Sequence, residues 1–197
     1  MKKYIVAIDT GSDKSAFVMY NKETKQLADR HWLPNMEVKE RLMKYYNSGE
    51  VELVLIEMSA SYGMPVGMEV LMNCFVIGMF SQLAKQYNLP VKLIFRKTVK
   101  LELCGALRKV NDSAVNITIR DMYWGDPGSK SKKNLNPFYF NEETDKNNAR
   151  SEMENNEWAA LGILTAYLNN PKCVDYNSQR ELSKMDAELI EYLEKVN

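Results

Sequence analysis

The sequence predicts an α/β protein with a mixed β-sheet and helices that flank it. Three strand-like segments open the chain, and the first two are joined by a tight turn. After them, helical patterns alternate with short apolar runs of strand length. A meander of neighbouring strands followed by alternating helices and strands is typical of a mixed sheet packed between helices.

Each expected element has its own local signal. The expected strands are short apolar or alternating runs bounded by turn residues, at 3–9, 15–21, 26–33, 51–59 and 90–95. The expected helices begin after capping residues or carry a 3.6-residue period, and they lie at 35–48, 66–88, 111–123, 154–168 and 178–196. Asn35 is the expected N-cap of the first helix. The helix at 66–88 is apolar nearly all round, so we expect it to be buried against the sheet.

The length of 197 residues suits one domain with an appendage, which we place at 1–170 and 171–197. Residues 124–153 carry no clear period, and a loop of that length is usually functional or disordered. The last expected helix is amphipathic and is predicted to pack on the domain or across a dimer. Its apolar positions are Leu182, Met185, Leu189 and Leu193.

The charge of the chain is balanced overall but unevenly distributed. Lys and Arg number 26, as do Asp and Glu. Residues 81–133 hold 11 basic and 4 acidic side chains, whereas residues 134–197 hold 6 basic and 12 acidic ones. Such asymmetry predicts a basic surface for a polyanion in the middle of the chain.

Carboxylates stand where two of the apolar strands end. Asp9 ends the first strand, and Glu57 lies near the end of the run at 51–59. If these strands are neighbours, both acids emerge at one edge of the sheet. A carboxylate within an apolar strand is unfavourable unless it is paired or binds a metal. Glu154 and Glu157 share a face at the start of a late helix, where they either add ligands or interact with the helix dipole.

Oxygen ligands from several elements suit Mg²⁺ or Mn²⁺. Two such ions can activate water and stabilise the leaving oxygen in phosphodiester cleavage. A short acid such as Asp112, at the start of the helix at 111–123, is instead expected to cap that helix. No nucleophile and base of the Ser/His or Cys/His kind stand together, so covalent catalysis is not expected.

At this point the chain resembles the ribonuclease H-like superfamily, and more closely its RuvC-like Holliday-junction resolvases, particularly the phage-type members. The resemblance rests on the order and spacing of five segments: AIDTGS (7–12), LIEMSASYGMPVG (55–67), VKLELCG (99–105), NDSAV (111–115) and EWAALGILTAYL (157–168). It implies a homodimeric endonuclease that uses Mg²⁺ or Mn²⁺, two ions per site, to nick branched DNA such as a four-way junction.

Carried onto this sequence, the resemblance makes Asp9 and Glu57 the first two catalytic acids and metal ligands. The family places Asp-x-x-Asp before Ala-Leu, or a single acid before Trp-Ala-Ala-Leu. Glu157 directly precedes Trp158 and is therefore the expected third acid, with Glu154 as a possible fourth. The other register, counted back from Ala160-Leu161, falls on Asn156 and Ala159, which carry no charge.

DNA affinity is expected to come mainly from phosphate neutralisation. Tyr62 and Gly63 follow Glu57 closely, so the ring is expected to stack on an unpaired base and the glycine to allow close approach of the backbone. The basic candidates for phosphate contacts are Arg96, Lys97, Lys100, Arg108, Lys109, Lys130, Lys132 and Lys133.

Two other function classes stay open. The stretch IVAIDTGSDKSAF also resembles the first phosphate motif of actin and sugar-kinase ATPases, although those proteins need two such lobes and far longer chains. A catalytically inactive branched-DNA-binding protein of the same fold is the other alternative. No run approaches the ~18 to 20 apolar residues of a membrane span, and the three cysteines are widely spaced. A cytoplasmic protein without a membrane partner is therefore expected, and the resemblance implies that it is phage-encoded or lies in the bacterial cytosol.

Overall fold

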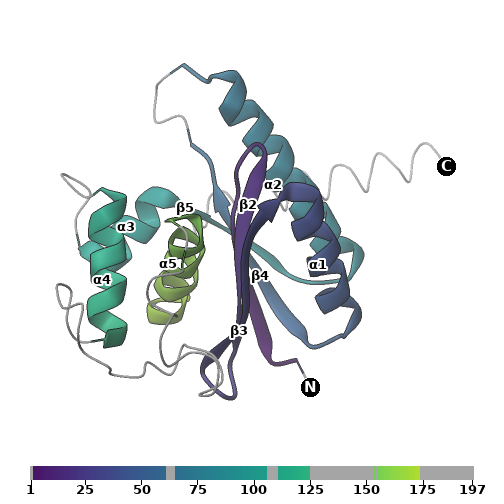
Figure 1. Ribbon diagram of the computed structural model, residues 1–197, viewed down its shortest axis with the longest axis horizontal. Coiled ribbons are helices and arrows are strands. Elements are labelled where there is room, and N and C mark those ends of the chain that lie inside the picture. Colours follow the sequence, from purple (N-terminus) through teal and green to yellow (C-terminus); the bar gives the residue numbers. More distant parts are fainter. Residues whose placement is uncertain (1, 61–64, 106–110, 125–152, 154, 174–197) are drawn as a thin grey trace.

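The computed structural model describes residues 2–60, 65–105, 111–124, 153 and 155–173. The expected helix at 178–196 and most of the predicted 171–197 extension lie outside these ranges, as does most of the expected loop at 124–153. Figure 1 shows the described part as one sheet with helices on both faces.

The sheet has five strands in the order β3-β2-β1-β4-β5. β1 pairs with β2 and β2 with β3 in antiparallel fashion, whereas β1 pairs with β4 and β4 with β5 in parallel. This mixed sheet confirms the predicted fold class. The strands are β1 Tyr4–Asp9, β2 Lys14–Asn21, β3 Gln26–Pro34, β4 Val51–Met58 and β5 Val91–Phe95.

The helices form two layers, one on each face of the sheet (Figure 1). One layer holds α1 and α2, and the other holds α3, α4 and α5. Their bounds are α1 Asn35–Asn47, α2 Met68–Gln86, α3 Arg96–Cys104, α4 Asp112–Trp124 and α5 Asn155–Asn169. The sequence interpretation missed α3, because this helix begins directly where β5 ends and leaves no turn signal between them.

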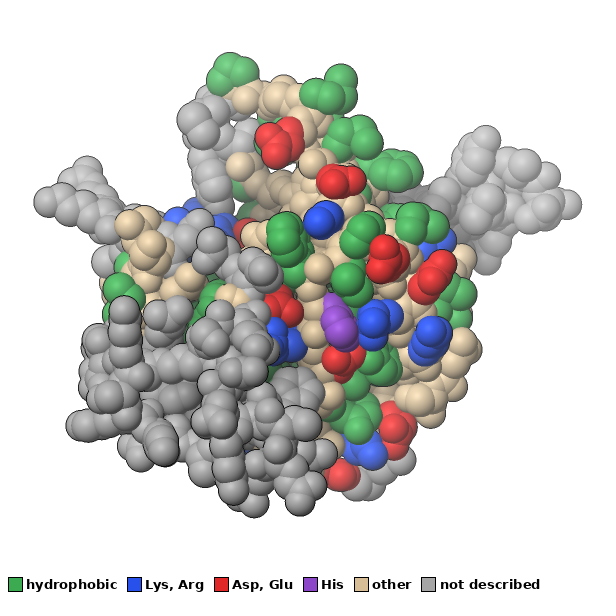
Figure 2. Space-filling view, in the orientation of Figure 1, with side chains coloured by type: hydrophobic (Ala, Val, Ile, Leu, Met, Phe, Trp, Pro, Cys, Tyr) green, Lys and Arg blue, Asp and Glu red, His purple; other side chains and the backbone are tan. Residues whose placement is uncertain are grey.

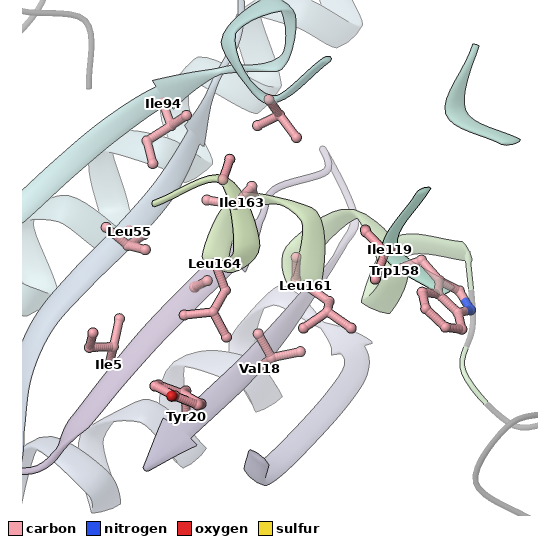
Figure 3. Packing of buried hydrophobic residues seen from close by; sticks show 14 of the residues in the cluster. Ile5, Val18, Tyr20, Leu55, Ile94, Ile119, Trp158, Leu161, Ile163 and Leu164 are labelled. Carbon is pink, nitrogen blue, oxygen red and sulfur yellow. The ribbon is translucent and has the colours of Figure 1, made fainter. Parts of the chain in front are cut away.

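Alternate residues of the central strands serve the two layers. On β1, Ile5 and Ala7 face the layer of α5, whereas Val6 and Ile8 face α1 and α2. Figure 3 shows the first of these cores, where α5 residues such as Leu161 and Leu164 pack over the strands. α5 is buried nearly all round, with every residue from Glu157 to Ala166 inaccessible to solvent or nearly so. Its position between the sheet and the helices α3 and α4 explains this burial.

The expectation of a fully buried α2 is wrong for its first half. The C-terminal half packs on the sheet through residues such as Val76 and Phe80. The N-terminal half extends past the end of the sheet (Figure 1) and exposes large apolar side chains. These are Met68, Leu71, Met72 and Phe75. Despite its apolar composition, neither α2 nor any other helix in the described ranges is long and apolar enough to cross a membrane.

Two expected caps differ from the observed ones. Asn35 is the first residue of α1 rather than its N-cap, and its side chain makes no capping hydrogen bond. Asp112 is the first residue of α4, and the residue before it, Asn111, caps the helix, because Asn111 Oδ1 accepts a hydrogen bond from the Ala114 backbone N–H at 2.9 Å. The chain therefore enters α4 one residue earlier than the placement of Asp112 as a cap requires.

Candidate active site

The pairing of β1 with β4 brings two acidic residues together. The strands run parallel with Ile8 opposite Ile56, so Asp9 and Glu57 follow side by side at the carboxyl edge of the sheet. The strands themselves are buried, with Ile8 and Ile56 fully inaccessible to solvent. The backbone of a rigid core therefore fixes the separation of the two carboxylates.

The turn after Asp9 is held by a closed set of hydrogen bonds. The Gly11 backbone N–H donates to Ser15 Oγ at 3.3 Å, and that hydroxyl donates to Asn35 Oδ1 at 2.6 Å. Asn35 Nδ2 in turn donates to the carbonyl oxygens of Gly11 at 3.0 Å and Ser12 at 3.2 Å. The side chain expected to cap α1 thus fastens the turn to the start of that helix.

Gly11 is required in this turn by close approach of the backbone. A Cβ atom at this position would collide with the Lys14 carbonyl oxygen, which is itself backbone and cannot swing aside. The small-residue turn is therefore needed to bring the chain sharply back into β2. The glycine of the sequence Thr10-Gly11-Ser12 thus has a steric role in the turn.

Asp9 and Glu57 line an open pocket of about 540 Å³ at the edge of the sheet. Five elements or their adjoining turns contribute to its wall, and most of the lining side chains are polar or charged. The hydroxyl oxygen of Thr10 is buried and has no hydrogen-bond partner among the described residues. The remaining lining residues are Arg96, Lys100, Ser113, Asn116, Asn156 and Ala159.

Two basic residues of α3 face the acids in this pocket. Arg96 Nη1 lies 3.2 Å from Glu57 Oε2, and both side chains are about one-fifth exposed, at 21% and 18%. Lys100 follows four residues later, so it lies on the same face of the helix. The pocket therefore combines carboxylates, which bind cations, with cations that bind phosphate.

The donor set fits a divalent ion between Asp9 and Glu57. Carboxylate oxygens from two rigid strands, with hydroxyl and amide groups nearby, are ligands that Mg²⁺ and Mn²⁺ accept. The unpartnered Thr10 hydroxyl also indicates that the pocket is built for a polar ligand. Within the described residues, no third Asp, Glu, His or Cys joins a group able to hold a metal.

Glu157 does not line this pocket. The residue as a whole is only 4% exposed. Its carboxylate pairs with Arg30 of β3, with 2.6 Å between Arg30 Nη1 and Glu157 Oε2. Successive helical residues point about 100° apart, so the rotation of α5 that buries Glu157 turns Asn156 and Ala159 to the pocket. The structure thus disagrees with the sequence-based placement of Glu157 beside Asp9. The α5 residues that line the pocket with Asp9 are the uncharged Asn156 and Ala159.

Few of the predicted DNA-binding residues are in the described part of the chain. Arg96 and Lys100 line the pocket, and Lys97 is exposed on α3 without lining it. The other candidate site residues lie outside the described ranges: Glu154, Tyr62, Gly63, Arg108, Lys109, Lys130, Lys132 and Lys133.

The sequence interpretation did not single out Thr10, Ser113 or Asn116 as site residues. Their only sequence signal is their place: Thr10 follows Asp9 directly, and the other two lie three residues apart near the start of α4. Such spacing puts Ser113 and Asn116 on one helical face.

Comparison with solved structures identifies the fold. The RuvC structure of Thermus thermophilus superposes with a TM-score of 0.60 and 14% identity, covering 86% of this chain and 95% of that one. The chain has the fold of RuvC. RuvC of T. thermophilus in complex with Holliday junction substrate gives a TM-score of 0.58 at 13% identity, with the same coverages of 86% and 95%.

A third solved structure shares the RuvC fold. The yeast mitochondrial Holliday junction resolvase Ydc2 superposes with a TM-score of 0.54 at 14% identity, covering 84% of this chain and 77% of that one. No family model and no curated protein matches the sequence.

The ion pair of Glu157 with Arg30 predicts that Glu157 contributes to stability and not to metal binding. Replacing Glu157 with Gln removes the charge opposite Arg30 in a mostly buried setting, so we expect the free energy of unfolding to fall by about 1 to 3 kcal/mol. Mn²⁺ binding should persist, since Glu157 does not line the pocket. Urea denaturation and Mn²⁺ titration followed by electron paramagnetic resonance measure the two quantities.

Glu52→Gln is the matched control, because Glu52 pairs with Lys22 at 2.6 Å on the surface, with side chains 40% and 43% exposed. Its effect on stability should stay below about 1 kcal/mol. Loss of Mn²⁺ binding in a stably folded Glu157→Gln protein would contradict the observed placement and restore Glu157 as a metal ligand.

Proposed function

We propose that this protein is a structure-selective DNA endonuclease that resolves Holliday junctions or other branched DNA with a divalent metal ion. The observation that carries the proposal is the pair Asp9 and Glu57 at the edge of a sheet with the RuvC fold. The pocket also presents Arg96 and Lys100, which suit a phosphodiester. The T. thermophilus structure with a bound Holliday junction supports the choice of substrate.

In the proposed reaction, Asp9 and Glu57 would hold the ion through their carboxylate oxygens. A bound Mg²⁺ or Mn²⁺ supplies Lewis acidity and lowers the pKa of water at the scissile phosphate. Arg96 and Lys100 orient the phosphate and offset its charge. The water oxygen would form the new bond to phosphorus and give up a proton to solvent, while the bond from phosphorus to the leaving oxygen breaks and that oxygen takes up a proton from solvent.

The number of ions is part of the proposal. Two ions per site follow from the family resemblance, and the described carboxylates of the pocket, Asp9 and Glu57, provide for the first of them. Glu154 is the remaining candidate for a second ion, and it lies outside the described residues.

A homodimer is also proposed, because resolving a four-way junction needs two nicks related by two-fold symmetry. The exposed large apolar side chains of α2 repeat at intervals of three and four residues from Met68 to Phe75, which places them in a stripe along one helical face. Figure 2 shows hydrophobic side chains gathered in the upper part of the molecule, where this half of α2 lies. The same stripe on a second copy can cover it.

The second candidate function is an inactive protein that binds branched DNA without cutting it. The observation that favours it is the pocket position of Asn156 and Ala159, where the family resemblance places two acids. Under either function we propose a bacterial cytosolic setting and a phage-type member of the resolvases, in line with the resemblance.

The first prediction from the proposed function concerns cleavage of a labelled synthetic four-way junction. With Mg²⁺ or Mn²⁺ we expect paired nicks on the junction in preference to a linear duplex, and none with EDTA. Asp9→Asn and Glu57→Gln should each lower the nicking rate by ~10² to 10³-fold. Removal of one key electrostatic group from an active site slows a reaction by about this factor. Tight junction binding without nicks in either metal would favour the inactive DNA-binding protein instead.

A second prediction adds a carboxylate to the pocket wall. Asn156→Asp places a third negative charge beside Asp9 and Glu57, so Mn²⁺ affinity should rise by about tenfold, equivalent to ~1.4 kcal/mol. Mn²⁺ titration of the free protein measures this. Asn47→Asp, with the same change of charge on an exposed position of α1, should leave the affinity as it is. Equal affinities in both variants would place Asn156 outside the metal site.

A third prediction concerns the α2 stripe. The exposed fraction of Phe75 is 71%, and a lysine there would be desolvated on dimer formation. Phe75→Lys should therefore shift a dimer to the 22.8 kDa monomer in sedimentation velocity. The control is Ile117→Lys on α4, where the native side chain is also exposed, at 47%. An unchanged dimer in Phe75→Lys would show that the stripe is not the interface.

A further inference from the structure

Arg96 competes for the carboxylate that the proposed ion needs. Its Nη1 lies 3.2 Å from Glu57 Oε2, inside the pocket that Asp9 also lines. The contact follows directly from the topology, since Glu57 of β4 lies opposite Ile94 of β5 and Arg96 comes two residues later. In this place the Glu57 carboxylate can therefore meet either the Arg96 guanidinium or a metal ion from solution.

Arg96 lies at the N-terminus of α3, where its positive charge favours a nearby anion such as Glu57. Arg96 and Lys97 occupy the first turn of α3, and no acidic residue stands there. Positive charge at a helix N-terminus is disfavoured by the helix dipole, by ~0.3 to 1 kcal/mol per charge. The Glu57 carboxylate offsets this effect for Arg96. An anion such as a DNA phosphate offsets it equally well, because it meets both the cations and the helix N-terminus.

We propose, on the basis of the proposed function, that Arg96 links metal binding to DNA binding by exchanging Glu57 for a backbone phosphate. Without a metal ion, Arg96 holds Glu57 and neutralises it. When an ion takes the Glu57 carboxylate, Arg96 turns to the phosphate that enters the pocket, next to Lys100. Arg96 is thus a positioning residue that strengthens DNA binding at sites that hold the ion.

A purely structural ion pair is the competing explanation. The two side chains are 21% and 18% exposed and line an open pocket, so an ion or a phosphate that enters the pocket can reach both of them. A structural role also does not require Lys100 to face the same pocket from the next turn of α3. The exchange accounts for both basic residues at this place.

Binding experiments on the full-length protein test the exchange without any need for turnover. Mn²⁺ affinity is measured on the free protein by electron paramagnetic resonance. Affinity for a four-way junction is measured by fluorescence anisotropy with Ca²⁺ and with EDTA, and gels confirm that the DNA stays uncut. The ratio of the two junction affinities reports the coupling between ion and DNA, which is reciprocal by thermodynamic linkage.

Arg96→Gln should raise Mn²⁺ affinity, because the competing guanidinium is gone, and lower the Ca²⁺-to-EDTA affinity ratio by about fivefold or more. The matched control is Lys97→Gln, which removes the same charge from an exposed position in the same turn. It should weaken junction binding equally with and without Ca²⁺ and leave Mn²⁺ affinity unchanged. Arg96→Lys should keep part of the coupling, and circular dichroism melts confirm that each variant is folded.

The outcomes separate this inference from the proposed function. Unchanged or weaker Mn²⁺ binding in folded Arg96→Gln, or an affinity ratio equal to that of the original protein, overturns the exchange alone. Failure of the original protein to bind Mn²⁺ overturns the proposed metal-dependent function, and the exchange with it. Failure to bind the junction despite normal Mn²⁺ binding overturns the proposed substrate together with the exchange.

Discussion

The parallel pairing of β1 with β4 is the constraint on which the site depends. It joins two segments almost fifty residues apart, and it places Asp9 and Glu57 at one edge. Because both strands are covered by helices on each face, neither can slip by one residue without moving its apolar side chains to the wrong layer. The register that builds the core therefore also fixes the two carboxylates.

Polar residues next to the ends of the strands also help to position the groups of the pocket. Asn35 ties the turn after Asp9 to α1, and Arg96 follows β5 without an intervening loop. Each positions the charged groups by its backbone connection to a strand. The pocket is consequently assembled from strand ends and helix starts, whose positions the buried sheet determines.

The sequence predicts the sheet well, because alternation and strand-length apolar runs directly report burial on its faces. It predicts the neighbourhood of Asp9 and Glu57 for the same reason. The phase of α5 could not be predicted, since the helix is buried on all sides from Glu157 to Ala166 and has no polar face to indicate its rotation. The assignment of Glu157 to the pocket rested on its place before Trp158, whereas burial opposite Arg30 decides its orientation.

The Arg30–Glu157 pair has a consequence for how this pocket can evolve. It holds the start of α5 against β3, and neither Arg30 nor Glu157 lines the pocket. Substitutions at Asn156 can alter the chemistry of the pocket while the core packing stays the same. A charged group at position 156 can therefore change the pocket without disturbing the buried packing of α5.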